Sequence, residues 1–147
     1  MRISPIAAAV TMAGTMLWSA VPALADDDGQ APPPPPPAAH HVRYIVSATG
    51  PIYSNIYYRE VDPPSWSDYS HNPYEFSPRA DVTIGPDKPW VFDTTLNDPN
   101  LWATVMVQSG EAPNFKTPTF KCKLEVDGVV VKENSGAHGA LCSIRNW

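Results

Sequence analysis

Basic side chains are scarce in this sequence of 147 residues, and they do not gather in one stretch. Ten Lys and Arg stand against fifteen Asp and Glu, and the net charge is −5. Nucleic-acid binding requires clustered Lys and Arg that neutralise phosphates, so we expect no nucleic-acid partner. The same charge balance provides no electrostatic attraction to anionic lipid headgroups.

The short motifs that carry catalysis are missing as well. The sequence has no G-x-S-x-G, no H-E-x-x-H and no glycine-rich phosphate loop. His71 and His138 lie far apart and lack the cysteine or carboxylate spacing of a metal site, and the adjacent pair His40-His41 is a weak signal. We therefore expect no enzymatic activity, no catalytic residues, no cofactor and no metal. A pair of glycosidase-type carboxylates needs no short motif, so that alternative stays open.

Long apolar runs are missing after the first 25 residues. Residues 6–21 are mostly apolar, but about sixteen residues fall short of the roughly 20 that span a bilayer. Arg2 precedes this run and Ala23-Leu24-Ala25 follows it, which predicts a secretory signal peptide over residues 1–25. The alternative is an uncleaved membrane anchor. Cleavage predicts a protein with no stable membrane span that is secreted or held in the periplasm or cell envelope.

Residues 26–41 contain acids and a run of prolines at 32–37 but no large apolar side chain. Such a segment cannot bury enough surface to offset its ordering entropy, so we expect a disordered acidic, proline-rich linker. Its prolines favour an extended polyproline II spacer. Removal of the leader takes away Arg2 and makes the net charge of the remaining chain −6.

Only two cysteines are present, Cys122 and Cys142. In an exported protein two cysteines that flank a hairpin are most simply one disulfide. A redox pair would usually be C-x-x-C, and a zinc site would need further ligands at a suitable spacing. We expect a structural disulfide between Cys122 and Cys142.

The remaining residues, 42–147, should form one domain of β-strands. Alternation of apolar and polar residues predicts strands over 42–48, 52–59, 88–96 and 101–108, with a short edge strand at 81–84 and a turn at 97–100. In the strand 101–108, Ala103 and Val105 should point inward and Trp102 outward. About seven short strands without an amphipathic helix predict an all-β fold, an antiparallel two-layer β-sandwich of the immunoglobulin-like kind.

Residues 120–131 carry the strongest local signal, a β-hairpin. Asp127-Gly128 lies between an alternating run and the β-branched run 129–131, as a type I′ turn requires. The predicted register places Val126 opposite Val129 and Leu124 opposite Val131, so that the buried faces agree. It also places Glu133 opposite Cys122, so we expect the second strand to bend or end near residue 133.

Residues 60–80 interrupt the strand pattern with four prolines, and we expect a long irregular loop there. Its four large aromatic residues either pack on the domain or form a contact surface. They are the candidate partner or ligand contacts: Trp66, Tyr69, Tyr74 and Phe76.

The runs VRYIVSATG, KPWVFDTT, LWATVMVQ and CKLEVDGVVVKEN follow one another in this order before a later cysteine. This ordered set, which spans most of residues 42–142, resembles the small MmpS proteins of mycobacteria. The matching positions are Pro89-Trp90, Cys122, Leu124, Val126-Asp127-Gly128, Val130 and Cys142. The resemblance implies a periplasmic immunoglobulin-like β-sandwich with one disulfide, and an accessory role beside MmpL transporters, which export lipids and siderophores.

Two features depart from that family pattern. MmpS proteins usually keep an N-terminal anchor, whereas this chain has a cleavable leader and a proline-rich linker, and its loop 60–80 is long and aromatic. A secreted MmpS-like member with its own binding role is therefore equally consistent with the sequence.

Two functions follow from these observations. The first is a non-enzymatic interaction module that docks to an envelope protein, such as an MmpL-type transporter, and it predicts a filled core with partly exposed aromatics on loop 60–80. The second is a carrier of a lipid or other apolar small ligand, and it predicts a concave apolar pocket of several hundred Å³. Because a small sandwich packs its interior solid, we expect the interaction module.

Overall fold

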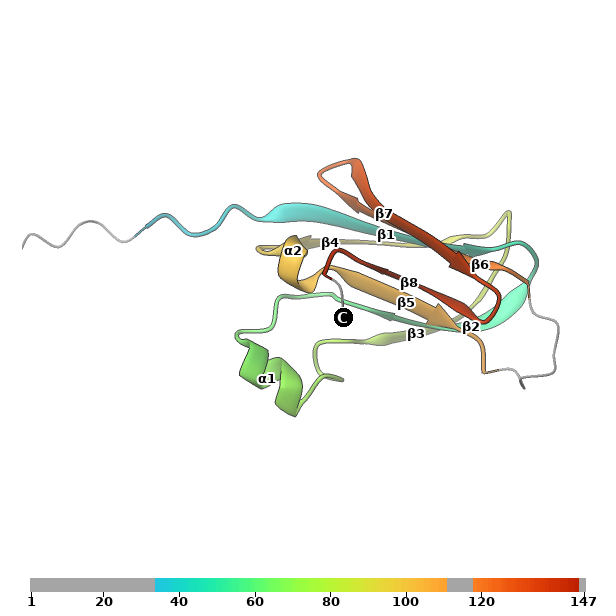
Figure 1. Cartoon of the computed structure of the whole chain (residues 1–147), viewed down its shortest axis with the longest axis horizontal. Helices are drawn as coiled ribbons and strands as arrows, with labels where there is room; N and C mark the ends of the chain where they lie inside the picture. Colours follow the sequence, from blue (N-terminus) through green and yellow to red (C-terminus); the bar gives the residue numbers. More distant parts are fainter. Residues whose placement is uncertain (1–33, 111–117, 146–147) are drawn as a thin grey trace, which may run out of the picture. The chain divides into compact units, whose positions relative to one another are not determined.

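The computed structural model describes residues 34–110 and 118–145 (Figure 1). The chain divides after residue 34, and the fold below is that of the second unit, residues 35–147. The expected signal peptide and most of the expected linker lie outside the described residues. None of the helices in the described part is long and apolar enough to cross a membrane.

The described residues form eight strands and two short helices. The strands are β1 (His40–Ala48), β2 (Ile52–Tyr58), β3 (Arg79–Ile84), β4 (Trp90–Leu96), β5 (Thr104–Gln108), β6 (Phe120–Val126), β7 (Val129–Gly136) and β8 (Gly139–Ser143). The helices are α1 (Trp66–His71) and α2 (Pro99–Trp102).

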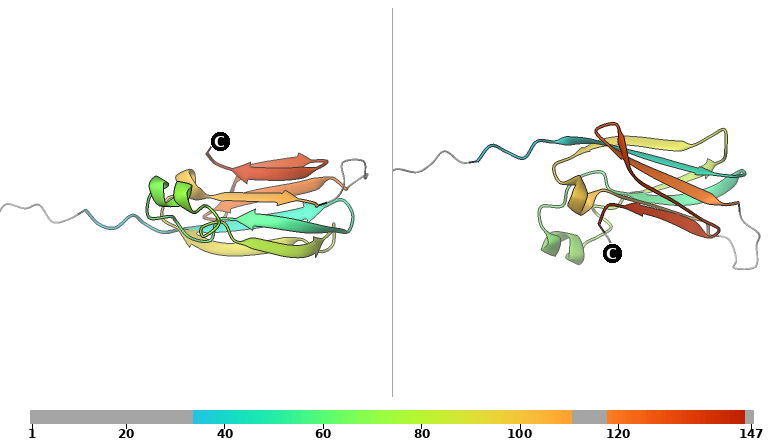
Figure 2. Two further views of the ribbon diagram at one scale, coloured as in Figure 1. Left: turned by 90° about the horizontal axis from the view of Figure 1, so that it is seen from below. Right: turned by 45° about the horizontal axis from the view of Figure 1, so that its top comes forward.

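The strands build two four-stranded antiparallel sheets that pack face to face (Figure 2). Sheet A has the order β4-β1-β6-β7 and sheet B the order β3-β2-β5-β8. The expected all-β, two-layer sandwich is confirmed. Compared with the seven expected strands, the additional one is β8, which pairs with β5 at the edge of sheet B.

The core lies between the two sheets. The alternation of apolar residues along β1 and β2 agrees with their burial, because every second residue of a strand points to the same face. The buried positions alternate along the central strands: Val42, Tyr44 and Val46 in β1, Ile52, Ser54 and Ile56 in β2, Val105 and Val107 in β5, and Phe120, Cys122 and Leu124 in β6. The buried Tyr44 hydroxyl donates a hydrogen bond to the carbonyl of Arg59 at 2.9 Å, so burial leaves no polar group of Tyr44 unpaired.

The predicted hairpin exists, but its register changes beyond the turn. Val126 lies opposite Val129 as expected, whereas Leu124 lies opposite Lys132 because a β-bulge at Val131 adds one residue to β7. Cys122 therefore faces Asn134 rather than Glu133, and β7 continues to Gly136. Val129, Val130 and Val131 are exposed, so the expected burial of the second strand was wrong.

The segment 97–104 also differs from the expectation. Asp98 accepts a hydrogen bond from the Leu101 backbone N–H at 3.0 Å and caps the short helix α2, which has Pro99 in its first turn. A helical turn rotates successive side chains by about 100° rather than 180°. Trp102, predicted to point outward, is therefore buried, and β5 begins only at Thr104.

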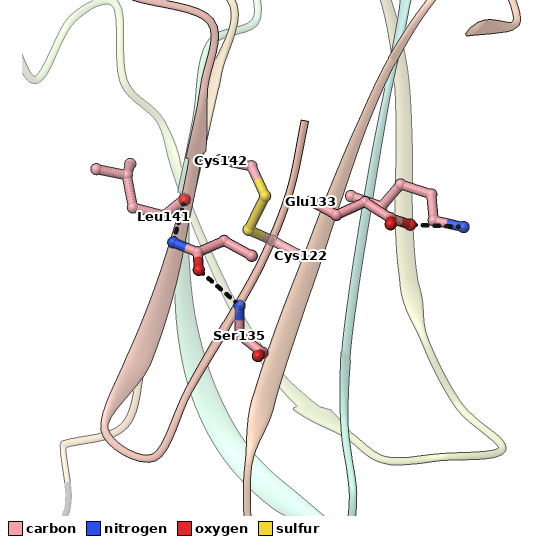
Figure 3. The surroundings of a disulfide bond; sticks show 7 residues. Cys122, Glu133, Ser135, Leu141 and Cys142 are labelled. Atoms are coloured by element: carbon pink, nitrogen blue, oxygen red, sulfur yellow. Dashed lines mark hydrogen bonds and ion pairs between the residues drawn. A yellow bond between two sulfur atoms is a disulfide. The ribbon is translucent and has the colours of Figure 1, made fainter. Parts of the chain in front are cut away.

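The disulfide Cys122–Cys142 joins β6 of sheet A to β8 of sheet B (Figure 3). The expected pairing is confirmed, and an entropic constraint on a loop of this length stabilises the fold by about 3 kcal/mol. Beside it, the Asn134 side-chain amide donates to the Leu141 carbonyl at 3.0 Å. This hydrogen bond joins β7 to β8, the edge strands of the two sheets, on the same side of the sandwich as the disulfide.

The chain crosses from sheet A to sheet B between β7 and β8, and two glycines make this crossing possible. A Cβ on Gly139 would lie 2.5 Å from the Val107 carbonyl oxygen, and a Cβ on Gly136 would collide with the Gly139 carbonyl oxygen. Backbone atoms cannot move aside as the end of a flexible side chain can, so both positions require glycine.

Strand β1 starts at His40, two residues earlier than the predicted domain boundary, because side chains of neighbouring strands hold its first residues. The Asp127 carboxylate contacts His40 Nδ1 at 2.7 Å and accepts from the His41 backbone N–H at 3.0 Å. Asp93 lies 2.9 Å from His41 Nε2 and accepts two hydrogen bonds from Arg43, at 2.8 and 3.2 Å. The hydrogen bond from Arg43 lowers the pKa of Asp93, and the one from His40 lowers the pKa of Asp127.

We predict that Gly139→Ala destabilises the domain by about 1–3 kcal/mol, because the added methyl group must displace a backbone carbonyl. The free energy of unfolding, measured by urea denaturation, tests this. Gly110→Ala is the matched control, since a Cβ there meets no atom within 4 Å. Its free energy of unfolding should change by no more than about 0.5 kcal/mol. Equal stability of the two variants would contradict the packing argument.

We also predict that acid destabilises the domain through Asp93 and Asp127. Their folded-state pKa values lie below the unfolded value of about 3.9, so their contribution is complete above that pH and is lost as the pH falls through the folded values. In urea titrations, Asp93→Asn combined with Asp127→Asn should lower stability at neutral pH and flatten its decline below about pH 4. Asp87→Asn, an exposed acid between β3 and β4, is the control; a parallel decline for all three proteins would refute the assignment.

Candidate functional site

The segment between β2 and β3 is anchored to the sandwich at several points rather than being a free loop. Ser65 caps α1 by accepting a hydrogen bond from the Asp68 backbone N–H at 3.1 Å. The Asp62 carboxylate accepts from the backbone N–H groups of Asn97 and Asp98, at 2.7 and 3.0 Å. The Thr94 hydroxyl donates to the Glu60 carbonyl at 2.6 Å. The expected irregular loop 60–80 thus contains a helix and is tied to the end of β4.

An aromatic cluster forms where α1 meets α2. The ring centroids of Trp66 and Tyr69 lie 5.6 Å each from that of Trp102 and 5.4 Å from each other. The Arg145 guanidinium lies 4.4 Å from the centre of the Trp66 ring. Aromatic pairs and cation–π contacts each stabilise a fold beyond the apolar area that they bury. The cluster therefore helps to hold α1 against α2.

Arg59 lies at the centre of this cluster, directly after β2. Its guanidinium carbon is 4.4 Å from the centre of the Tyr69 ring and 5.6 Å from that of Trp102. The side chain is fully buried, with 0% exposed surface. Its Nη1 donates to the carbonyl of Phe76, which attaches the far end of the segment 60–80 to β2.

The other two nitrogens of the Arg59 guanidinium, Nε and Nη2, lack the partners that buried polar groups usually have. Both Nε and Nη2 are buried and have no hydrogen-bond partner. No acidic side chain of the described ranges forms a salt bridge with Arg59. Asp62 lies three residues further along the chain, but its carboxylate accepts hydrogen bonds from the backbone N–H groups of Asn97 and Asp98.

A hollow of about 480 Å³ lies beside this cluster, on the outer face of sheet B beneath the segment 60–80. We call it the aromatic hollow. Sheet B contributes outward residues of three strands, and the segment 60–80 contributes the opposite wall. Its apolar walls are Tyr57, Tyr69, Pro73, Tyr74, Met106 and Leu141.

The four aromatic residues singled out in the sequence lie in different environments. Trp66 and Tyr69 join the cluster on Trp102, although 45% of the Trp66 surface stays exposed. Tyr69 and Tyr74 line the aromatic hollow, and Tyr74 is 79% exposed. Phe76 is half-buried and contributes its carbonyl to Arg59. Only Tyr69 belongs to both the cluster and the hollow.

Four residues of the cluster and the hollow were not predicted as site residues from the sequence: Arg59, Trp102, Met106 and Leu141. Arg59 could have been found, because the alternation of β2 places it on the same outward face as Tyr57. A charged residue on the same strand face as an aromatic residue indicates a polar group beside an apolar surface. Leu141 had no local signal, since β8 was not recognised as a strand.

A second, larger hollow of about 630 Å³ lies beside β1, β6 and β7, but its walls are polar. Lys121, Lys123, Glu133 and Ser135 line it, and Lys123 pairs with Glu133 at 3.2 Å. Charged side chains that pair with one another across a surface groove are the ordinary arrangement of a solvated face. The aromatic hollow is therefore the better candidate site.

The described residues that line the aromatic hollow include tyrosines but no His, Cys, Asp, Glu, Lys or Arg. Burial raises the pKa of Tyr44, whose hydroxyl points to the Arg59 carbonyl within the core. In the described ranges no group of three or more His, Cys, Asp or Glu could hold a metal ion. The hollow offers aromatic, aliphatic and amide surfaces, which suit binding by contact.

Comparison with known proteins identifies the domain. The family described as the Rv2576c beta-sandwich domain matches residues 44–142. The chain is 34% identical to the uncharacterized protein Rv2576c of Mycobacterium tuberculosis (strain ATCC 25618 / H37Rv) over 147 residues, which covers 99% of this chain and 88% of that protein. It has the same identity and coverage with the uncharacterized protein Mb2606c of Mycobacterium bovis.

The resemblance to MmpS proteins is therefore wrong, because the family match and these relatives point to a different family. Its matching positions have general structural causes: Pro89-Trp90 leads into a strand, Asp127-Gly128 makes a hairpin turn, and the two cysteines join the sheets. The MmpL-type partner came from that resemblance alone and has lost its support. This chain belongs to the Rv2576c beta-sandwich domain family.

Proposed function

We propose that this protein is an exported, non-enzymatic binding module that holds an apolar ligand in the aromatic hollow. The observation that supports this most is the hollow itself, a concave apolar surface of about 480 Å³ on a sheet face that a globular domain would otherwise leave polar. Ligand pockets are typically of this size and combine apolar walls with a few polar groups.

The geometry favours a small ligand over a docked protein. The hollow is bounded on one side by outward residues of β2, β5 and β8 and on the other by Tyr69, Pro73 and Tyr74. A concave surface with walls on two sides suits a small ligand better than the broad surface of a folded partner. The core between the sheets is occupied by buried side chains, so the space for a ligand lies outside the sandwich.

Docking to an envelope protein remains the second candidate, and one observation favours it. Trp66 and Tyr74 are exposed large aromatics on the same segment. Exposed aromatic side chains are common where a protein partner binds.

Export is supported by two features of the chain. Residues 1–25 have the pattern of a secretory leader. The Cys122–Cys142 disulfide suits an oxidising compartment outside the cytosol.

The binding proposal can be tested with Nile red, a neutral apolar dye whose fluorescence rises in apolar surroundings. The purified full chain should bind the dye saturably. Met106→Asn combined with Leu141→Asn should weaken binding by about 10-fold or more, because two apolar walls are replaced by side chains that must be desolvated. These two residues are cross-strand neighbours in β5 and β8, and both are exposed.

The matched control is Val91→Asn combined with Val130→Asn, which alters two equally exposed apolar residues of sheet A, away from the hollow. This pair should bind the dye as the unaltered chain does. If the control pair weakens binding as much as the hollow pair, or if the unaltered chain shows no saturable binding, the aromatic hollow is not a ligand site.

A further inference from the structure

We propose that Arg59 binds the carboxylate of the ligand, so that the aromatic hollow takes a single-chain amphiphile with a carboxylate head. This inference rests on the proposed function, since it names the class of ligand for the same site. It is carried by the two unpaired nitrogens of a fully buried guanidinium that packs on Tyr69, a residue that lines the hollow.

A buried guanidinium that lacks an acidic partner is rare. Removing a cation from water is costly unless hydrogen bonds or an opposite charge compensate for the loss. The faces of Tyr69 and Trp102 and the Phe76 carbonyl compensate in part. Nε and Nη2 still have no acceptor, which leaves a place where an external anion would be bound favourably.

The two unpaired nitrogens point to a carboxylate in particular. Nε and Nη2 share one edge of the planar guanidinium and together form the fork that grips a carboxylate through two parallel hydrogen bonds. Arg43 uses the same edge in this protein: its Nε and Nη2 donate to the two oxygens of Asp93, at 2.8 and 3.2 Å. Arg59 presents the same pair of donors without the carboxylate.

The position of Arg59 connects this fork to the hollow. Arg59 continues the outward row of β2 that includes Tyr57, and its backbone N–H donates to the Thr104 carbonyl at 3.0 Å. Tyr57 and Thr104 both line the aromatic hollow. The outer face of sheet B thus leads from the apolar walls to the guanidinium, and the polar end of the site lies next to its apolar part.

Tyr69 controls access from the hollow to Arg59. Its ring covers the guanidinium on one side and also lines the hollow. It belongs to α1, a six-residue helix without a buried residue, so a shift of this short helix would open a path from the hollow to the guanidinium. A carboxylate would then accept two charge-assisted hydrogen bonds in the plane of the guanidinium, in addition to the contact of the ring with its face.

Competition against bound Nile red tests the inference, with decanoate and 1-decanol as probes of equal chain length. At about pH 7.5 decanoate is ionised, whereas decanol is neutral. Decanoate should bind about 10- to 100-fold more tightly, which is the range for a pair of hydrogen bonds to a charged group. Acetate, which has the same head and almost no chain, should not displace the dye.

Arg59→Gln should abolish the preference for decanoate while decanol still competes. Arg43→Gln is the matched control, because its fork is already occupied by Asp93, and it should keep the preference. Since Arg59→Gln could impair folding, a measurement on the unaltered chain is added. In a nitrogen–proton correlation spectrum of arginine-labelled protein, decanoate should shift the Nε–H signal of Arg59, and decanol should not.

The possible results separate the two proposals. If decanol competes as well as decanoate, the hollow binds apolar ligands but the role of Arg59 is refuted. If Nile red does not bind and neither probe perturbs the spectrum, the proposed function fails together with this inference. A decanoate preference that survives Arg59→Gln would overturn the assignment of the carboxylate to Arg59.

Discussion

The face-to-face packing of the two sheets is the constraint on which the rest of this structure depends. The inward residues of β1 and β6 meet those of β2 and β5, and they leave no exposed surface on Val42, Tyr44, Ile56 or Leu124. Interiors of this kind are packed as densely as organic crystals. A small sandwich therefore has no internal space for a ligand, and any binding surface must be built on an outer face.

The outer face of sheet B becomes such a surface because the segment 60–80 lies over part of it. That segment is rich in prolines and cannot pair with a strand, so it must be held by other contacts. Arg59 supplies two of them, through the face of Tyr69 and the carbonyl of Phe76. The same residue that organises the segment also carries the unpaired donors beside the aromatic hollow.

The mistaken resemblance to MmpS proteins shows that local sequence motifs of β-structure do not identify a protein family. A proline before a strand, an Asp-Gly turn and two cysteines on facing sheets are solutions to common problems of β-structure. Proteins of different families reach them independently, so their order along a chain supports a fold more strongly than a family. The fold was confirmed for this reason, although the family was not.

Local periodicity determined much of the architecture. Strands β1, β2 and β4, the hairpin turn at Asp127-Gly128 and the disulfide were all predictable, because each follows from the spacing of neighbouring residues or from the number of cysteines. The predictions were wrong where a helix cap or a β-bulge interrupted the regular alternation of a strand. Asp98 started a helix that buried Trp102, and the bulge at Val131 shifted β7 by one residue.

The candidate site was determined only by the tertiary structure. Trp102 and Leu141 are distant in sequence from Arg59 and the segment 60–80, and no spacing within one strand shows that they approach it. Their meeting depends on which strands pair, since β2 lies beside β5 and β5 beside β8. The sequence by itself determined which faces of the strands are apolar; the pairing of the strands decided which of those faces are buried and which line a hollow, because burial is a property of what packs against a face.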